Sequence, residues 1–241
     1  MASGSYNTHT QKEHGAASRV GSELKNLVLG GQDGLVNVFG LIMGVAAGTN
    51  DTKTVIIAGL AGTFAESISM AAVAYTSTKA ARDYYDSERE HELREMKTIP
   101  DMERREVREI FKKKGFHGRL LDSIVKHVTS KKKLWLETMM SDELGLSKNG
   151  TDHAGRSALI VGLAAVAGSF VPLLPFFFIH PPSAAIPLVA VISTITLFVA
   201  GSAGALLTTG VWWKRGLQMA LIGMAAALAG YGIGAWLGVA L

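Results

Sequence analysis

Long apolar stretches alternate with polar segments along the chain. The apolar stretches cover residues 27–48, 55–74, 159–179, 186–207 and 217–241. Each is close to the roughly 20 residues that an α-helix needs to cross the hydrocarbon core of a bilayer. The pattern therefore predicts an all-α integral membrane protein with five transmembrane helices, two within residues 23–80 and three within residues 151–241.

The polar segment between the second and third apolar stretches predicts a helical domain over residues 81–150. No Gly or Pro occurs from Thr63 to Ile99, so the second span should continue as one helix beyond the bilayer. Further helices are expected from Asp101 to Gly115, from Arg119 to Thr129 and from Ser130 to Gly145.

The distribution of positive charge predicts the orientation in the membrane. Of the 24 Lys and Arg residues, 18 lie from Lys79 to Arg156, whereas only Lys53 separates the first two spans and no Lys or Arg separates the third from the fourth. Because cytosolic segments carry the excess of Lys and Arg, we expect the amino terminus and the 81–150 domain to be cytosolic. Residues 1–22 lack the apolar core of a signal peptide and are predicted to be a flexible cytosolic tail.

Composition narrows the function classes. The absence of Cys excludes thiolate catalysis, cysteine-ligated zinc and iron–sulfur clusters. The net charge of +4 does not indicate a nucleic-acid partner, since the basic residues flank apolar spans and alternate with acids. These exclusions leave a membrane protein without cysteine chemistry, and we expect no enzymatic activity and no prosthetic group.

Two acids, Asp33 and Glu66, lie inside the apolar stretches. A charge at mid-bilayer costs on the order of 2.5–3.5 kcal/mol, so such residues usually face a bundle interior or an ion path. Helical spacing places each acid on a face with small residues. The face of the first span carries Asp33, Asn37, Gly40, Gly44 and Gly48, and that of the second carries Gly59, Gly62, Glu66, Met70 and Val73.

Carboxylate oxygen from Asp33 and thioether sulfur from Met70 are a donor set that suits a first-row transition metal better than Mg²⁺ or Ca²⁺. A carboxyl group in a low dielectric can hold a proton when the metal is absent, so metal and proton would compete for one site. A packing interpretation stays open, in which Asp33 hydrogen-bonds within the bundle, Met70 fills space and the glycines only bring helices together.

Carboxylates also recur on three helices of the polar segment. They are Glu88, Glu92 and Glu95 on the first helix, Glu103 and Glu106 on the second, and Glu143 beside Met139 and Met140 on the last. Because like charges on one helix face repel, this arrangement predicts a bound cation and a multinuclear metal site. The alternative is an ordinary solvated face with surface ion pairs such as Arg82–Asp86, and two methionines in the core.

Four segments together resemble the vacuolar iron transporter family. They are Asp33-Gly-Leu, Ser67-Ile-Ser-Met70, Trp135 through Glu143-Leu-Gly, and Gly168 through Pro172-Leu-Leu-Pro to Phe178. The resemblance implies five spans per subunit, a homodimer with the path at the subunit interface, and export of ferrous iron from the cytosol in exchange for protons. It leaves Mn²⁺, Co²⁺ and Zn²⁺ open as cargo, and the plasma membrane or a vacuolar storage membrane as the location.

By this resemblance, Asp33 and Met70 match the ligands of the path. Glu92, Glu95, Glu103, Glu106, Met139, Met140 and Glu143 match the cytosolic metal-binding domain. One position departs from the family pattern: the Glu expected eight residues before Met70 is Gly62, and the acid is Glu66 instead. An alternative function is a membrane-tethered carboxylate bundle that oxidises, stores or senses iron without moving it across the membrane.

Overall fold

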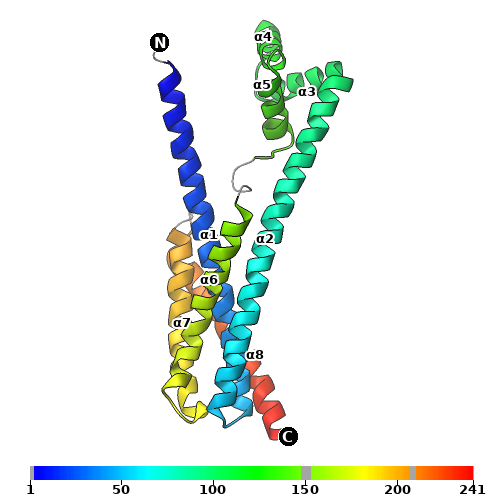
Figure 1. Cartoon of the computed structure of the whole chain (residues 1–241). Helices are drawn as coiled ribbons and strands as arrows, with labels where there is room; N and C mark the ends of the chain where they lie inside the picture. The colour runs from blue at the N-terminus through cyan, green and yellow to red at the C-terminus, as the bar shows by residue number, and fades with distance from the viewer. Residues whose placement is uncertain (1–2, 148–152, 207–209, 241) are drawn as a thin grey trace. The chain divides into compact units, whose positions relative to one another are not determined.

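The computed structural model describes residues 3–147, 153–206 and 210–240. Its helices are α1 (Ser3–Gly48), α2 (Thr52–Thr98), α3 (Pro100–Lys113), α4 (Gly118–Thr129), α5 (Lys132–Thr138), α6 (Ala154–Leu173), α7 (Pro182–Leu206) and α8 (Trp212–Ala240), with a π-helical turn η1 (Met139–Glu143) and a 3-10 turn η2 (Leu174–Phe177) (Figure 1). No strand occurs in these ranges, which confirms the predicted all-α class. The chain divides into two compact units, residues 1–76 with 153–241, and residues 77–152.

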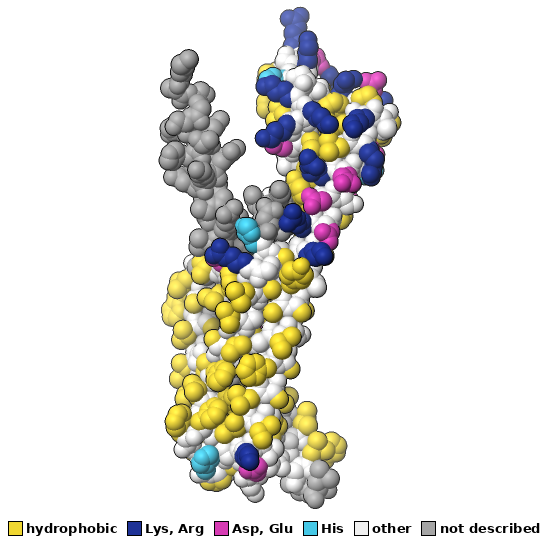
Figure 2. Space-filling model, viewed as in Figure 1, with side chains coloured by type: hydrophobic (Ala, Val, Ile, Leu, Met, Phe, Trp, Pro, Cys, Tyr) yellow, Lys and Arg dark blue, Asp and Glu magenta, His cyan; other side chains and the backbone are white. Residues whose placement is uncertain are grey.

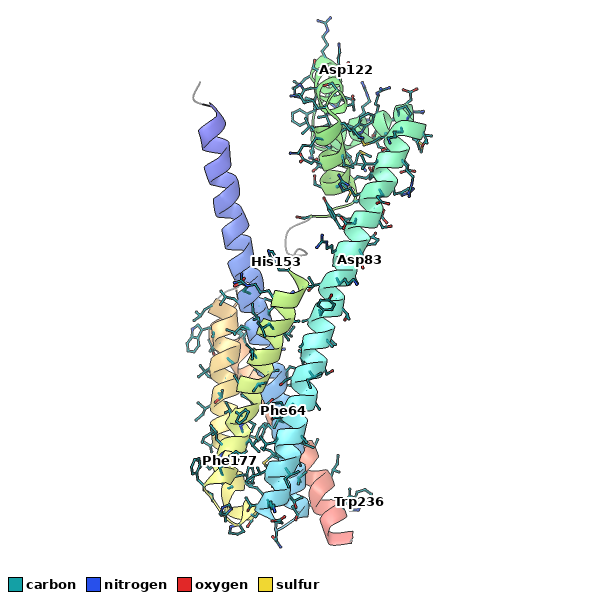
Figure 3. All side chains as sticks on the ribbon, in the orientation of Figure 1. Phe64, Asp83, Asp122, His153, Phe177 and Trp236 are labelled. Carbon is teal, nitrogen blue, oxygen red and sulfur yellow. The ribbon has the colours of Figure 1, made fainter. Side chains whose placement is uncertain are left out.

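Among the described residues, five helices are long and apolar enough to cross a bilayer. They are Glu23–Gly48, Thr52–Thr98, Ala154–Phe177, Pro182–Leu206 and Trp212–Gly238. Large apolar side chains on them face outward, including Phe64 and Trp236, which are 55% and 74% exposed (Figure 3). On the face shown in Figure 2, hydrophobic side chains cover the spans, whereas Lys and Arg gather over the second unit. The chain is a multi-pass membrane protein, and its five spans confirm the prediction.

Glycines let α1 approach both α6 and α8 closely. On the α6 side, a Cβ added at Gly34 would lie 2.9 Å from the Cα of Ala165, and Gly31 faces Gly168. On the α8 side, a Cβ added at Gly44 would lie 2.9 Å from the carbonyl oxygen of Gly230. Only residues without a side chain allow backbones of neighbouring membrane helices to meet in this way.

The order of these contacts fixes the directions of the spans. Along α1, Gly40, Gly44 and Gly48 meet Gly230, Gly234 and Gly238 in turn, so α8 runs parallel to α1. Helices α7 and α8 run in opposite directions. Gly201 of α7 meets Arg215 of α8, whereas Leu197, which is earlier in α7, meets Gly223, which is later in α8. The spans therefore alternate in direction, and the first and last spans end on the same side of the bundle.

The second unit has its own core, which brings α3, α4, α5 and η1 together with the polar half of α2. The buried apolar residues are Met96, Val107, Val128, Trp135, Leu136, Met139 and Met140. Gly115, after α3, and Gly145, after η1, have φ values of 93° and 65°, a conformation that glycine adopts without strain and that ends a helix. The predicted helices of this segment are confirmed, with boundaries within a few residues.

The backbone of α1 is helical from Ser3 onward. It therefore includes most of residues 1–22, for which a flexible cytosolic tail stays a prediction. The segment contains no Pro, and extending an existing helix adds one hydrogen bond for each residue fixed. Its polar composition therefore did not exclude a helix once the first span had nucleated one.

Candidate metal-binding groups in the two units

Three polar side chains of α1 and α2 meet within the apolar part of the first unit. The side-chain amide of Asn37 donates a hydrogen bond of 3.4 Å to Oδ2 of Asp33. The carboxyl group of Glu66 lies within interaction distance of the side chains of both Asp33 and Asn37. Since an ionised carboxylate can only accept, a hydrogen bond between Asp33 and Glu66 requires a proton on one of them.

An open cavity of about 360 Å³ lies beside this group. It is lined by Asn37, Val38 and Leu41 of α1 and by Gly62, Ala65, Glu66 and Ser69 of α2. A water molecule occupies about 30 Å³ of liquid, so the cavity has room for an ion with part of its hydration shell. Gly62, the position where the family pattern has its acid, lines this cavity, and a Cβ added there would meet the side chain of Leu41.

Met70 lies one helical turn beyond Glu66 and is half-buried. The neighbouring Ala71 packs against Gly162 of α6, and Gly30 of α1 packs against the adjacent Val161. Met70 is therefore level with the residues just before Asp33. Asp33 is therefore closer to the carboxyl group of Glu66 than to the thioether of Met70, which lies one turn further along α2.

In the second unit, carboxylates from α2, α3 and η1 gather into one cluster. Its members interact electrostatically with one another and are Glu92, Glu95, Glu103, Glu106 and Glu143. Glu92 and Glu103 are 5% and 2% exposed, and the Oε2 atom of each has no hydrogen-bond partner among the described residues. A buried acceptor without a partner is costly, so these two carboxyls need a proton or a cation.

The same environment shifts the acidity of the cluster. Burial, followed by repulsion from Glu106, raises the pKa of Glu103 to about 8. Glu92 lies in the polar half of α2. Its burial, and to a smaller extent repulsion from Glu143, raises its pKa to about 7. Burial also raises the pKa of Glu143. At neutral pH the metal-free cluster therefore retains protons that a cation would displace.

The π-helical turn η1 separates two kinds of side chain. The backbone N–H of Leu144 donates to the carbonyl of Met139 at 3.1 Å, which closes a turn one residue wider than that of an α-helix. Met139 and Met140 lie in the apolar core at 0% and 2% exposure, whereas Glu143 is exposed and lies among the carboxylates. The buried methionines are the arrangement that the packing interpretation predicts.

Within residues 3–147, 153–206 and 210–240, no three His, Asp or Glu side chains are already placed to hold one metal ion. The five carboxylates of the second unit are thus a group of mutually repelling acids, without a closed coordination shell. His91 lies beside the cluster, with its Nε2 atom 3.5 Å from Oε1 of Glu95.

Two features of these groups were not identified from the sequence. Asn37 was placed on the Asp33 face but not recognised as a site residue, although its spacing of four from Asp33 was an available signal. The π-helical turn at Met139 has no sequence signature and depends on how α5 packs against the rest of the second unit.

Comparison with known proteins finds similarity to one family over most of the chain. Residues 24–235 match the model of the VIT family. A protein named vacuolar iron transporter 1 from Eucalyptus grandis is 32% identical over 213 residues, which is 88% of this chain and 86% of the relative. The vacuolar iron transporter of Centaurea cyanus is 32% identical over 230 residues, covering 95% and 92% of the two chains. Vacuolar iron transporter 1 of Arabidopsis thaliana is 31% identical over 223 residues, covering 92% and 88%.

These relatives are named as transporters and not as enzymes. The family match runs from residue 24 to residue 235 and so reaches into all five spans and includes the second unit. The chain therefore belongs to the VIT family.

Proposed function

We propose that this protein moves a divalent transition metal, most readily ferrous iron, out of the cytosol in exchange for protons. The observation that carries the proposal is the close placement of the Asp33 and Glu66 carboxyl groups inside the apolar spans. The names of the relatives, vacuolar iron transporters, support iron as the cargo. Mn²⁺, Co²⁺ and Zn²⁺ present similar chemistry to a carboxylate and thioether site.

Charge balance explains how such a pair exchanges metal for protons. Ionised Asp33 and Glu66 together carry two negative charges, which one divalent ion or two protons neutralise. A neutral site is strongly preferred in a low dielectric, so the site favours either cargo over remaining empty and charged. The amide oxygen of Asn37 and the sulfur of Met70 supply further donors, and the sulfur favours a transition metal over Mg²⁺.

We further propose that two copies form a homodimer along the exposed faces of α1 and α2, with the cavity beside Glu66 opening onto the seam. Support comes from the outer surface of α2, where Ile57, Phe64 and Ile68 are 58%, 55% and 70% exposed. The cavity itself is open and is lined only by residues of α1 and α2.

In this proposal the segment 81–150 is cytosolic and collects metal for the membrane site. Its buried carboxyls, Glu92 and Glu103, lack partners for one oxygen each within the described part of the chain, which supports a cation-binding role. The excess of Lys and Arg in this segment supports its cytosolic location. The relatives' names support a vacuolar membrane over the plasma membrane.

The experiment is a two-probe transport assay with pure protein in vesicles that contain a metal-quenched dye and a pH indicator. Fe²⁺ added on one side should quench the dye while protons move in the opposite direction. Asp33→Asn and Glu66→Gln should each reduce metal flux at least about tenfold, because each removes a charge that offsets the metal. Asp83→Asn, which removes an exposed carboxylate from the polar half of α2, is the matched control.

Unchanged flux in both variants would exclude the Asp33–Glu66 pair as the transport site. Oxygen uptake with Fe²⁺ and no flux would instead support the ferroxidase or storage alternative, which needs the carboxylate cluster of the second unit and not the membrane pair.

A further inference from the structure

A second open cavity, of about 260 Å³, lies between α1, α7 and α8. Its polar lining consists of Gln32, Arg215 and Gln218, and its small residues include Gly201 and Gly204. It does not share a lining residue with the cavity beside Glu66. Nothing in the proposed transport path uses these side chains.

The register between α1 and α8 gives the depth of this cavity. Gly40 lies between Ala226 and Gly230, so Arg215 is level with residues 25–29, in the first turns of the span that begins at Glu23. Trp212 and Trp213, at the start of α8, are 52% and 48% exposed. Tryptophan concentrates at the boundary between hydrocarbon and water. The cavity therefore opens at the depth of the lipid headgroups.

The charge at this depth is positive and uncompensated. Arg215 has no ion-pair partner in the part of the chain that the structure describes, and the acid nearest in register, Glu23, is paired with Arg156 at 2.9 Å. A guanidinium can donate two parallel hydrogen bonds to a phosphate, and each glutamine amide adds N–H donors. This combination of groups recognises a phosphate-bearing anion.

We propose that this cavity binds the headgroup phosphate of an anionic phospholipid. The lipid is the favoured source of the phosphate because exposed leucines suited to acyl chains lie close in sequence to the residues that line the cavity. Leu206 at the end of α7 is 75% exposed, and Leu217 and Leu221 of α8 are 47% and 61% exposed. A soluble phosphate would gain nothing from these residues.

Binding is tested by native mass spectrometry and thermal unfolding of the full chain in neutral detergent. The probes are short-chain phosphatidylglycerol, phosphatidylcholine with the same chains, and inorganic phosphate. Phosphatidylglycerol should bind and raise the unfolding temperature, whereas phosphatidylcholine should bind more weakly because its choline offsets the phosphate charge. Arg215→Gln should weaken phosphatidylglycerol binding about tenfold, the effect of losing one charged hydrogen-bonding group.

Lys53→Gln is the matched control, since it removes one cation from the opposite edge of the bundle and should leave binding unchanged. Equal binding of the two lipids, or unchanged phosphatidylglycerol binding by Arg215→Gln, would overturn the proposal. Protection by inorganic phosphate equal to that by phosphatidylglycerol would also overturn it, in favour of a soluble anion. If Arg215→Gln does not fold, Gln218→Glu provides the test, because the added negative charge should weaken only phosphatidylglycerol binding.

Discussion

The carboxyl groups of Asp33 and Glu66 belong to different spans and lie within interaction distance of each other. The two acids are 33 positions apart in the sequence, and helical spacing alone did not pair them. Their contact requires a shared proton or a cation between them, because two ionised carboxylates cannot donate to each other. The same two oxygen-bearing groups can therefore serve metal and proton in turn.

Replacing Glu66 with Gln should change the coupling of transport as well as its rate. The amide can still hydrogen-bond to Asp33, but it can neither lose a proton nor offset the second charge of the metal. We expect the residual metal flux of Glu66→Gln to move fewer protons for each metal ion than the wild type does. Simultaneous recording of the metal dye and the pH indicator gives this ratio. A ratio equal to that of the wild type would mean that Glu66 is not a proton carrier.

Substitution of Met139 and Met140 by Leu should separate packing from metal binding. Leucine has nearly the same volume, so each change should cost less than about 1.5 kcal/mol of stability. Because leucine has no sulfur, we expect a several-fold loss of affinity for Fe²⁺ or Mn²⁺, measured by calorimetry on the full chain. Met102→Leu, on the exposed surface of α3, is the control. Unchanged affinity in the double variant would assign the two methionines to the core alone.

Metal binding to the second unit should release protons at neutral pH. The pKa values of about 7 for Glu92 and about 8 for Glu103 mean that both carboxyls hold protons part of the time until a cation displaces them. Apparent Mn²⁺ affinity should therefore fall as the pH is lowered from about 8 to below about 7. An indicator dye in weak buffer reports the protons released. Glu103→Gln should release fewer protons than Glu137→Gln, which alters an exposed carboxylate of α5, and equal release would contradict the assignment.

The metal-free second unit should lose stability as the pH rises. The pKa of Glu103 is about 8 in the folded chain and near 4.5 when the group is solvated, so between these values the folded state binds more protons than the unfolded state. The contribution of Glu103 to the free energy of unfolding is therefore greatest below about pH 4.5, and it is lost as the pH rises through about 8. Amide hydrogen exchange of residues 77–147, measured from pH 5 to pH 8 and corrected for the intrinsic exchange rate, follows this loss. Glu103→Gln should flatten the dependence, and an undiminished slope would exclude Glu103 as its cause.

Two glycines of α8 should respond in opposite ways to the same substitution. A Cβ at Gly234 would lie 2.9 Å from the Cα of Gly44 on α1, whereas a Cβ at Gly232 would meet nothing within 4 Å. Gly234→Ala should cost about 1–3 kcal/mol through overpacking, and Gly232→Ala should be neutral or slightly stabilising because Ala favours the helix. Unfolding in detergent measures both. Equal stability of the two variants would mean that α8 does not pack against α1 in this register.

The helices could be predicted from the sequence because each depends on residues close together in the chain. The five spans follow from apolar runs, and the end of α2 follows from Pro100, which cannot continue the helix. The helical backbone of Ser3–Val20 could not be predicted in the same way, because polar composition does not decide whether a helix that has already formed continues. That backbone extension depends on cooperativity with the first span.

The contacts within the site could be predicted only in part. Spacing correctly placed Asp33 and Asn37 on one face of α1, but the rotation of α2 about its axis decides whether Glu66 or Met70 meets them, and the sequence carries no measure of that rotation. Spacing likewise could not decide between core and ligand roles for Met139, since both require a buried thioether. The grouping of Glu92 with Glu103 was anticipated by their repetition on consecutive helices.

A transporter that exposes its site to each side of a membrane in turn must have a helix that moves relative to the others. The close approach of α1 to α6 at Gly31 and Gly168, and to α8 at Gly44 and Gly230, leaves no side chain between backbones that could rearrange to absorb a rotation. The contact of α2 with α1 is different, because a Cβ at Gly62 would touch only the flexible end of Leu41. We therefore expect α1 to stay fixed relative to α6 and α8 during transport. We expect α2 to move instead, because its displacement costs less free energy, and this movement would bring Glu66 toward Asp33 or away from it.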